Sequence, residues 1–221
     1  MLLETVEHET APEPQTSIIW LHGLGADGHD FEPVVPALSL GAERPLRFVF
    51  PHAPVRPVTV NGGVPMRAWF DIISASRDAA EDQQGIWQSV AAVAELVQRE
   101  KERGIAGDRI LMAGFSQGGA IALITALTHD EKLAGIIALS TFLPIADEVG
   151  TKLSAANRGI EVFMGHGVHD SMVSFRYGRN SRRKLTDFGA RVSWHEYPMD
   201  HGVMPDEVAD IRQFLNRIVK T

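Results

Sequence analysis

The segment GFSQG at 114–118 matches the pattern Gly-x-Ser-x-Gly and sets a serine between two nearby residues that lack side chains. It follows the apolar run RILMAG at 109–114 and opens the apolar helical stretch at 118–127. This strand–turn–helix setting is that of a nucleophile elbow, which lifts the hydroxyl above the sheet edge in front of a helix N-terminus. We therefore predict that Ser116 is the nucleophile of an acyl-transfer reaction. The alternative is an N-cap serine in an ordinary glycine-rich turn.

A serine nucleophile needs a base to take its proton, and the base needs an acid to orient it. In folds built around a nucleophile elbow, the chain order is serine, acid, histidine. His201 comes just after the last apolar run, which places it at the same sheet edge as Ser116. His195 lies inside that run, and His129 lies at the far end of a helix. We therefore predict that His201 is the base.

Three aspartates compete for the role of the acid. Asp170 follows the apolar run IEVFMG at 160–165 by one short loop, so it too lies at the sheet edge. Asp147, after the segment STFLPIA, is the main rival, and Asp200 is adjacent to the histidine that it would have to orient. Because a neighbouring side chain rarely curls back onto the ring beside it, Asp170 is the predicted acid and Asp147 the alternative.

A tetrahedral intermediate needs two hydrogen-bond donors for its oxyanion. One is expected to be the backbone N–H of Gln117, directly after the nucleophile, and the other an N–H in the loop after an early strand. That loop is HGLGADG at 22–28, and its glycines allow a close approach of the backbone. We assign the second donor to Leu24 and expect His22 to brace the loop. The alternative is a plain strand–helix turn.

A connection of about 30 residues, from Ala53 to Gln84, separates a predicted strand from its helix. Structureless loops of this length are uncommon unless they are functional. This one contains the large apolar residues Trp69 and Phe70, so we predict that it forms a wall of the acyl pocket. The alternative is a loop packed on its own small cluster. Two further candidates for the pocket wall, in the segment LSTFLP, are Phe142 and Leu143.

Short apolar runs alternate with helical periodicities along the whole chain. Runs that are apolar on both faces suit a parallel sheet, and alternation of strand and helix indicates a three-layer α/β fold with helices on both faces. Strands are expected at 17–21, 46–51, 109–114, 135–140, 160–165 and 191–197, with an antiparallel edge strand at 2–8. Helices are expected at 86–97, ended by Gly104, at 120–127 and at 208–218.

The composition excludes several other functions. The chain has 221 residues, no cysteine and a formal net charge of −7. A protein that binds a polyanion needs a surplus of Lys and Arg, so we expect neither nucleic-acid binding nor docking to an anionic membrane. No apolar stretch is long enough for a membrane span, and the acidic N-terminus lacks the apolar core of a secretory signal. We expect a cytoplasmic protein without stable membrane insertion, and the sequence leaves a homodimer open.

Two polar clusters have a second interpretation. His166, His169 and Asp170 could ligate zinc, but a catalytic site needs three ligands with an open position, and Asp170 already has a role. We therefore expect no metal and no cofactor. The basic stretch from Arg176 to Lys184 is typical of a solvated helix face, and its alternative is contact with an anionic head group or partner.

The chain resembles a known family. HGLGADG, VNGG, AWFDI, GFSQGG, LSTFLP, HGVHDSMV and PMDHGV occur in the order seen in the phospholipase/carboxylesterase family of α/β-hydrolases, over residues 16 to 219. The resemblance implies a single α/β-hydrolase domain over 1–221, a triad of Ser116, Asp170 and His201, and an oxyanion hole at Leu24 and Gln117. Two positions depart from the family. Phe70 stands where tyrosine is more frequent, and Met172 where proline or a polar residue is.

The sequence thus predicts a serine carboxylesterase that hydrolyses short- to medium-chain acyl esters through an acyl-enzyme. The substrate is expected to be a small-molecule or lipid ester. Acyl-protein thioesterase and lysophospholipase are alternatives, and a non-catalytic hydrolase-like binding protein is an alternative from another class, since fold alone does not imply activity. The intact set of catalytic candidates favours the enzyme. The sequence does not choose the physiological substrate, the acyl length or the oligomeric state.

Overall fold

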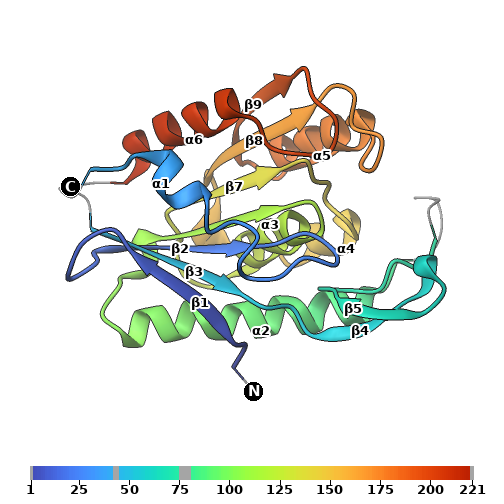
Figure 1. Cartoon of the computed structure of the whole chain (residues 1–221), viewed down its shortest axis with the longest axis horizontal. Coiled ribbons are helices and arrows are strands. Elements are labelled where there is room, and N and C mark those ends of the chain that lie inside the picture. Colours follow the sequence, from blue (N-terminus) through green and yellow to red (C-terminus); the bar gives the residue numbers. More distant parts are fainter. Residues whose placement is uncertain (1, 42–44, 75–80, 220–221) are drawn as a thin grey trace.

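A central sheet of seven strands organises the protein (Figure 1). The structure is a computed structural model and describes residues 2–41, 45–74 and 81–219. The strand order is β1-β3-β2-β6-β7-β8-β9, and every pairing is parallel except that of β1 with β3. The strands are β1 (Thr5–Glu9), β2 (Thr16–Leu21), β3 (Leu46–Pro51), β6 (Ile110–Phe115), β7 (Gly135–Leu139), β8 (Glu161–Gly167) and β9 (Arg191–Tyr197).

The strand sequences explain why helices cover both faces of this sheet. Along β2, Ile18 and Trp20 point to one apolar cluster, whereas Ile19 and Leu21 point to the other, and all four are buried. A strand that is apolar on both faces can be stable only between two layers. The structure therefore confirms the predicted three-layer α/β fold, including the antiparallel edge strand near the N-terminus.

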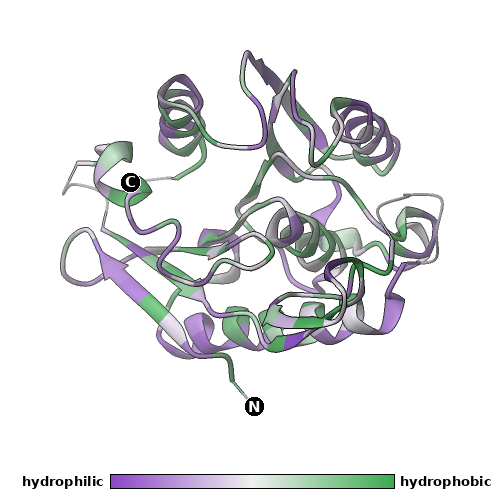
Figure 2. Cartoon of the chain, turned by 45° about the vertical axis from the view of Figure 1, so that its right-hand side comes forward, coloured by the Kyte–Doolittle hydropathy of each residue, from purple (hydrophilic) through white to green (hydrophobic). Residues whose placement is uncertain are grey.

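The helices form the two outer layers of the sandwich. Residues of α2, α3, α4 and α5 contribute to one apolar cluster, and residues of α1 and α6 contribute to the other. The outward faces of α2, α5 and α6 are hydrophilic, which Figure 2 shows as purple, whereas α3 is apolar and buried nearly all round. None of the helices within the described ranges is long and apolar enough to cross a membrane. The bounds are α1 (Val34–Leu38), α2 (Gln83–Glu102), α3 (Gln117–Thr128), α4 (Ala146–Thr151), α5 (Phe175–Asp187) and α6 (Pro205–Ile218).

The ends of α2 follow from local chemistry. Asp82 precedes the helix, and its Oδ1 accepts a hydrogen bond from the N–H of Gly85 at 2.9 Å, which satisfies a backbone donor of the first turn. After the last turn, Gly104 adopts a φ of +94°, a left-handed conformation that ends helices and suits glycine. The expected stop at Gly104 is confirmed.

The long connection before α2 is more ordered than its sequence suggested. It contains an antiparallel hairpin of β4 (Val55–Val58) and β5 (Val64–Arg67), with a short 3₁₀ turn at Thr59–Asn61 between them. Gly62 and Gly63 both have a positive φ and close the turn. Part of the connection, residues 75–80, lies outside the described residues. The carboxyl ends of β2, β6, β8 and β9 lie at one edge of the sheet, where the candidate side chains follow.

Candidate active site

Ser116 lies in the sharp turn between β6 and α3. Its φ is +53° and its ψ is −121°, a strained conformation for a residue with a side chain. Two glycines make room for the turn. A Cβ at Gly114 would come within 2.5 Å of the Gly118 backbone, and a Cβ at Gly118 within 2.4 Å of the His22 carbonyl oxygen. Because no side chain fits at either position, the Gly-x-Ser-x-Gly spacing is a steric requirement of this turn.

The structure brings Ser116, His201 and Asp170 into one chain of hydrogen bonds. His201 Nε2 lies 3.0 Å from Ser116 Oγ, and His201 Nδ1 lies 2.7 Å from Asp170 Oδ2. With its proton on Nδ1, His201 donates to the carboxylate and leaves Nε2 free to accept from the serine hydroxyl. This arrangement can remove the serine proton during attack on a carbonyl carbon and can stabilise the imidazolium that results.

The loop after β8 fixes the Asp170 carboxylate. Its Oδ1 accepts backbone N–H groups of Met172 at 2.9 Å and Val173 at 2.7 Å, so Oδ2 is left for His201. The buried ring of His166 closes the same loop, because its Nε2 lies 2.8 Å from the Val173 carbonyl oxygen. Burial lowers the pKa of His166, which keeps this ring neutral. The carboxylate is therefore held by backbone rather than by flexible side chains.

Asp200 joins the two loops that carry Asp170 and His201. Its Oδ1 accepts from the Ser171 N–H at 2.8 Å, the Ser171 hydroxyl at 2.9 Å and the His201 N–H at 2.8 Å. These hydrogen bonds lower the pKa of the exposed Asp200 carboxyl. Sequence reasoning considered Asp200 only as a rival acid and missed this role. The sequence feature that could have indicated this role is the position of Asp200 beside His201, in a loop expected at the same sheet edge as the Asp170 loop.

The loop after β2 approaches Ser116 from the opposite side. His22 is buried, its Nε2 accepts from the Ala53 N–H at 3.1 Å, and its Nδ1 lies 2.7 Å from the Gly23 carbonyl oxygen. These contacts require the proton on Nδ1. Burial lowers the pKa of His22 to about 4, so the ring is neutral near pH 7 and braces the loop that holds Leu24.

A cavity of about 240 Å³ opens beside the serine hydroxyl. Both predicted oxyanion donors and two predicted wall residues line it, together with Met172, whose side chain is largely exposed. The cavity wall is therefore mostly apolar, and its polar groups converge on Ser116. The lining residues are Gly23, Leu24, Ala26, Asp30, Phe70, Ile72, Phe115, Ser116, Gln117, Phe142, Met172, Val173 and His201.

The sequence profile of the phospholipase/carboxylesterase family matches residues 3–219. The chain belongs to this family. The family is one of α/β-hydrolases, and the chain is a hydrolase of the carboxylic-ester type. This confirms the resemblance that the ordered motifs indicated.

Individual proteins are also similar over nearly the whole chain. Acyl-protein thioesterase 1 of Mycosarcoma maydis is 35% identical, over 94% of this chain and 92% of that protein. Among solved structures, Arabidopsis thaliana SOBER1 has a TM-score of 0.88 at 28% identity and covers 93% of this chain and 99% of its own. Zea mays acyl-protein thioesterase 2 has a TM-score of 0.85 at 28% identity, with 97% and 99% covered.

The rival residues lie elsewhere in this family member. Asp147 is exposed at the start of α4 and pairs with Lys184 Nζ at 2.9 Å. His195, on β9, stacks on Phe163 of the neighbouring strand β8, and its Nδ1 lies 3.5 Å from an Asp210 carboxylate oxygen. Neither residue lines the cavity beside Ser116. Within the described ranges, no three His, Cys, Asp or Glu side chains are placed to hold one metal ion.

Two predicted wall residues of the acyl pocket are placed differently from the prediction. Phe70 and Phe142 line the cavity, but Trp69 and Leu143 do not. Trp69 has no exposed surface, because its side chain turns inward beneath the loop rather than outward into the cavity. Leu143 is also buried. Its backbone N–H donates to Ser181 Oγ at 2.8 Å, so its backbone packs against α5.

A second, larger cavity of about 480 Å³ lies near the amino ends of β7, β8 and β9. Its wall carries Lys132, Arg158, Arg191 and Arg217 but no serine. Size alone would therefore have selected the wrong end of the sheet as the reaction site. The basic stretch on α5, in contrast, is exposed from Arg176 to Lys184 except where the helix packs inward, and lines neither cavity.

Proposed function

We propose that this hydrolase cleaves acyl esters by two acyl-transfer steps at Ser116. His201 takes the hydroxyl proton as Ser116 Oγ attacks the carbonyl carbon, and Asp170 stabilises the imidazolium. The backbone N–H groups of Leu24 and Gln117 bind the oxyanion of the tetrahedral intermediate. Collapse of the intermediate breaks the bond to the leaving group, which takes its proton from His201. The products of this step are an alcohol or thiol and an acyl-serine.

The second step regenerates the serine. His201, neutral again, takes a proton from a water molecule that attacks the acyl-serine carbonyl. The same two N–H groups bind the second oxyanion. Its collapse returns the proton to Ser116 Oγ and releases the carboxylic acid. No cofactor or metal ion takes part in either step, because the histidine supplies every proton transfer.

One observation carries this proposal. Ser116 Oγ, His201 Nε2, His201 Nδ1 and Asp170 Oδ2 are joined by contacts of 3.0 and 2.7 Å at the wall of an apolar cavity. A binding protein without catalysis would not need a serine in a strained turn, a histidine within reach of it and a buried carboxylate behind that histidine. The geometry therefore favours an enzyme over a hydrolase-like scaffold.

The cavity also bears on the substrate. A volume of 240 Å³ holds about eight water-sized groups, which suits a short or medium acyl chain. We propose carboxylic esters of such acids as substrates, with acyl thioesters as the second candidate, because the similar fungal protein is named an acyl-protein thioesterase. A lysophospholipid is a further candidate that the family name suggests. The cytoplasmic location stays a prediction from the sequence.

Replacing the nucleophile tests the reaction. Ser116→Ala is expected to lower kcat for p-nitrophenyl butyrate about 10⁴-fold or more, since the triad residues act as a unit. The melting temperature should stay within about 2 °C, since a small side chain at the cavity wall is lost without leaving a buried group unpaired. A fluorophosphonate should label the wild type at Ser116 and leave the variant unlabelled.

Ser193→Ala, on β9, is the matched control and should keep full activity and labelling. A Ser116→Ala variant that retains a tenth of the wild-type rate contradicts the proposed nucleophile. The choice between esters and thioesters needs matched pairs, such as butyryl and octanoyl groups on an alcohol and on a thiol. A rate ratio near one between ester and thioester at both lengths would mean that the acyl cavity, rather than the leaving group, sets the preference.

A further inference from the structure

Trp69 is the most deeply buried aromatic residue of the long connection, and two of its polar contacts lead to segments of the active site. Its indole Nε1–H donates to the His22 carbonyl oxygen at 2.9 Å. Its ring also packs on the His22 ring, with centroids 5.3 Å apart. The Trp69 carbonyl oxygen accepts from the hydroxyl of Ser89 on α2. A buried indole N–H needs an acceptor, and here that acceptor belongs to the loop that carries Leu24.

The side chain of Gln117 reaches the same segment from the other side. It is buried, its Oε1 accepts from the Trp69 N–H at 2.8 Å, and its Nε2 donates to the Phe70 carbonyl oxygen at 2.7 Å. The amide thus pairs with the backbone of two consecutive residues, much as a neighbouring strand would. Gln117 is also the residue whose backbone N–H faces the oxyanion in the proposed mechanism.

The two donor-bearing segments therefore meet at one residue. The loop that carries the Leu24 N–H is tied to Trp69 through the His22 carbonyl, and the turn that carries the Gln117 N–H is tied to Trp69 through the Gln117 amide. The segments are separated by more than 90 positions in the sequence. Pairing of β2 with β6 brings them together, and these cross-links then tie the two loops beyond the strand ends to each other. We call His22, Trp69 and Gln117 the donor clamp.

We propose that Trp69 is a positioning residue that sets the spacing of the two oxyanion donors through the donor clamp. The inference rests on the proposed function, because it presumes that Leu24 and Gln117 bind an oxyanion. Oxyanion donors act only within a narrow range of distances from the developing charge, and a displacement near 1 Å can cost about 100-fold in rate. The oxyanion forms during the acyl-transfer steps and not on substrate binding. Loss of the clamp should therefore lower kcat more than it changes KM.

Two substitutions break the clamp at different bonds, Gln117→Met at nearly constant volume and Trp69→Phe with a smaller aromatic ring. Trp69→Phe removes the indole donor to His22, and Gln117→Met removes both side-chain hydrogen bonds but keeps the backbone N–H. Each variant is expected to lower kcat for p-nitrophenyl butyrate about 10- to 100-fold, with KM within about twofold of wild type. The affinity for an alkyl trifluoromethyl ketone, which forms an oxyanion on Ser116, should fall by the same factor as kcat/KM.

The combined variant gives a sharper readout. If both side chains serve one clamp, the Trp69→Phe/Gln117→Met protein should lose little more kcat than the worse single variant. Trp87→Phe is the matched control. Trp87 lies on α2, away from the cavity, and its Nε1 donates to Glu148 on α4 at 2.9 Å. This control loses an indole hydrogen bond as well, but its kcat and its inhibitor affinity should stay at the wild-type level.

Several outcomes would overturn the clamp. Folded variants with unchanged kcat contradict it, as do losses that appear in KM alone, losses that multiply in the double variant, or an inhibitor affinity that does not follow kcat/KM. Should Trp69→Phe fail to fold, Gln117→Met decides by the same criteria. A wild type without Ser116-dependent turnover contradicts the proposed function instead, so the two failures are distinct.

Discussion

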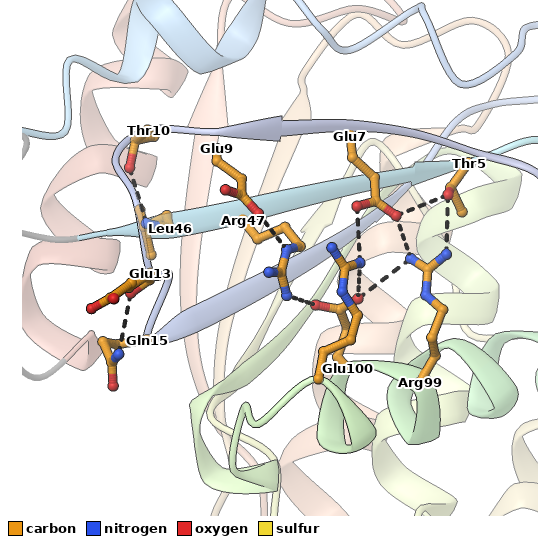
Figure 3. Close-up of polar contacts among 11 residues, drawn as sticks. Thr5, Glu7, Glu9, Thr10, Glu13, Gln15, Leu46, Arg47, Arg99 and Glu100 are labelled. Atoms are coloured by element: carbon orange, nitrogen blue, oxygen red, sulfur yellow. Dashed lines mark hydrogen bonds and ion pairs between the residues drawn. The ribbon is translucent and has the colours of Figure 1, made fainter.

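The donor clamp and a cluster of charges at the opposite end of the protein are both buried polar networks, but they are built from different groups. The clamp is formed by neutral side chains that bond to backbone atoms of loops. The charge cluster, shown in Figure 3, joins the last turn of α2 to β1 and β3 through alternating arginines and glutamates. Its members are Glu7, Glu9, Arg47, Arg99, Glu100 and Arg103.

Glu100 is the centre of the charge cluster. It has no exposed surface, and its two oxygens lie 2.9 Å from Arg47 Nη1 and 2.9 Å from Arg103 Nη1, with Arg99 at 3.4 Å. Taking a carboxylate out of water costs several kcal/mol, which nearby cations must offset. The cluster thus holds the edge strand and the helix together, whereas the clamp holds two loops at a defined spacing. Breaking the first should affect stability, and breaking the second should affect rate.

The largest expected effect distinguishes the reaction site from both networks. Asp170→Asn should lower kcat about 10⁴-fold, because an amide leaves His201 in the wrong tautomer and cannot stabilise the imidazolium. The fold should persist, since the amide oxygen can still accept the N–H groups of Met172 and Val173. The rate constant and a thermal melt of the purified variant check both statements.

Asp147→Asn is the matched control for the acid. Its carboxylate is exposed and pairs with Lys184, and exposed pairs contribute little to stability. The variant should keep both its activity and its melting temperature. Equal losses of kcat at Asp147 and Asp170 would contradict the assignment of Asp170 as the acid that orients His201.

The sequence predicted the reaction site more completely than it predicted either network. Apolar runs and a chain-order rule were enough to place Ser116, Asp170 and His201 at one sheet edge. The carboxyl ends of parallel strands lie at the same edge, whatever the length of the loops between them. Trp69 could not be placed in this way. Its backbone is tied to Gln117, 48 positions later, and no local pattern in a loop rich in proline and glycine reveals such a contact.

Glu100 left a signal that sequence reasoning did not use. It lies one helical turn after Leu96 and Val97 on the buried stripe of α2, so a charged residue stands where an apolar one is expected. Such a residue is retained only when it is paired. Its partner Arg47 lies on β3, 53 positions earlier in the sequence. The two residues come close only because of where β3 lies in the sheet. The pairing therefore had to be read from the structure.

The second effect in size tests the charge cluster. Glu100→Gln should destabilise the protein by about 3–5 kcal/mol, because it leaves the buried Arg47 guanidinium without its buried carboxylate partner. For a protein of this size the melting temperature should fall by roughly 6–20 °C, at about 2–4 °C per kcal/mol. At 25 °C the folded fraction should keep wild-type kcat, the reverse of the result expected for the clamp variants.

Glu102→Gln, on the exposed face of the same helix, serves as the control and should change the melting temperature by no more than about 1–2 °C. A Glu100→Gln protein that melts like wild type would mean that water or side-chain movement screens the arginines. A loss of kcat at full folding would show that the cluster and the reaction site are coupled, and the proposed division between stability and rate would be wrong.

The smallest effect comes from a buried glutamate that lacks such partners. Glu207, in the first turn of α6, is as buried as Glu100, but within the described part of the chain neither carboxylate oxygen has a well-formed hydrogen bond, and the nearby Met204 backbone offsets its burial only in part. Burial raises the pKa of Glu207 to about 8, and the Asp210 carboxylate adds to the shift. Near pH 7 the folded protein should therefore hold this carboxyl protonated, whereas the unfolded chain, with a value near 4.5, should not.

The sign of the pH dependence follows from that difference. Below the unfolded pKa both states are protonated, and as pH rises toward the folded pKa the unfolded state loses its proton first, so stability falls. Glu207→Gln removes this titration. Its melting temperature should exceed that of wild type by several degrees at pH 8 and match it near pH 4. Asp206→Asn, exposed on the same turn, should give no pH-dependent difference. A Glu207→Gln protein that is less stable than wild type at pH 8 would mean that the carboxylate has an ionised partner, as Glu100 does.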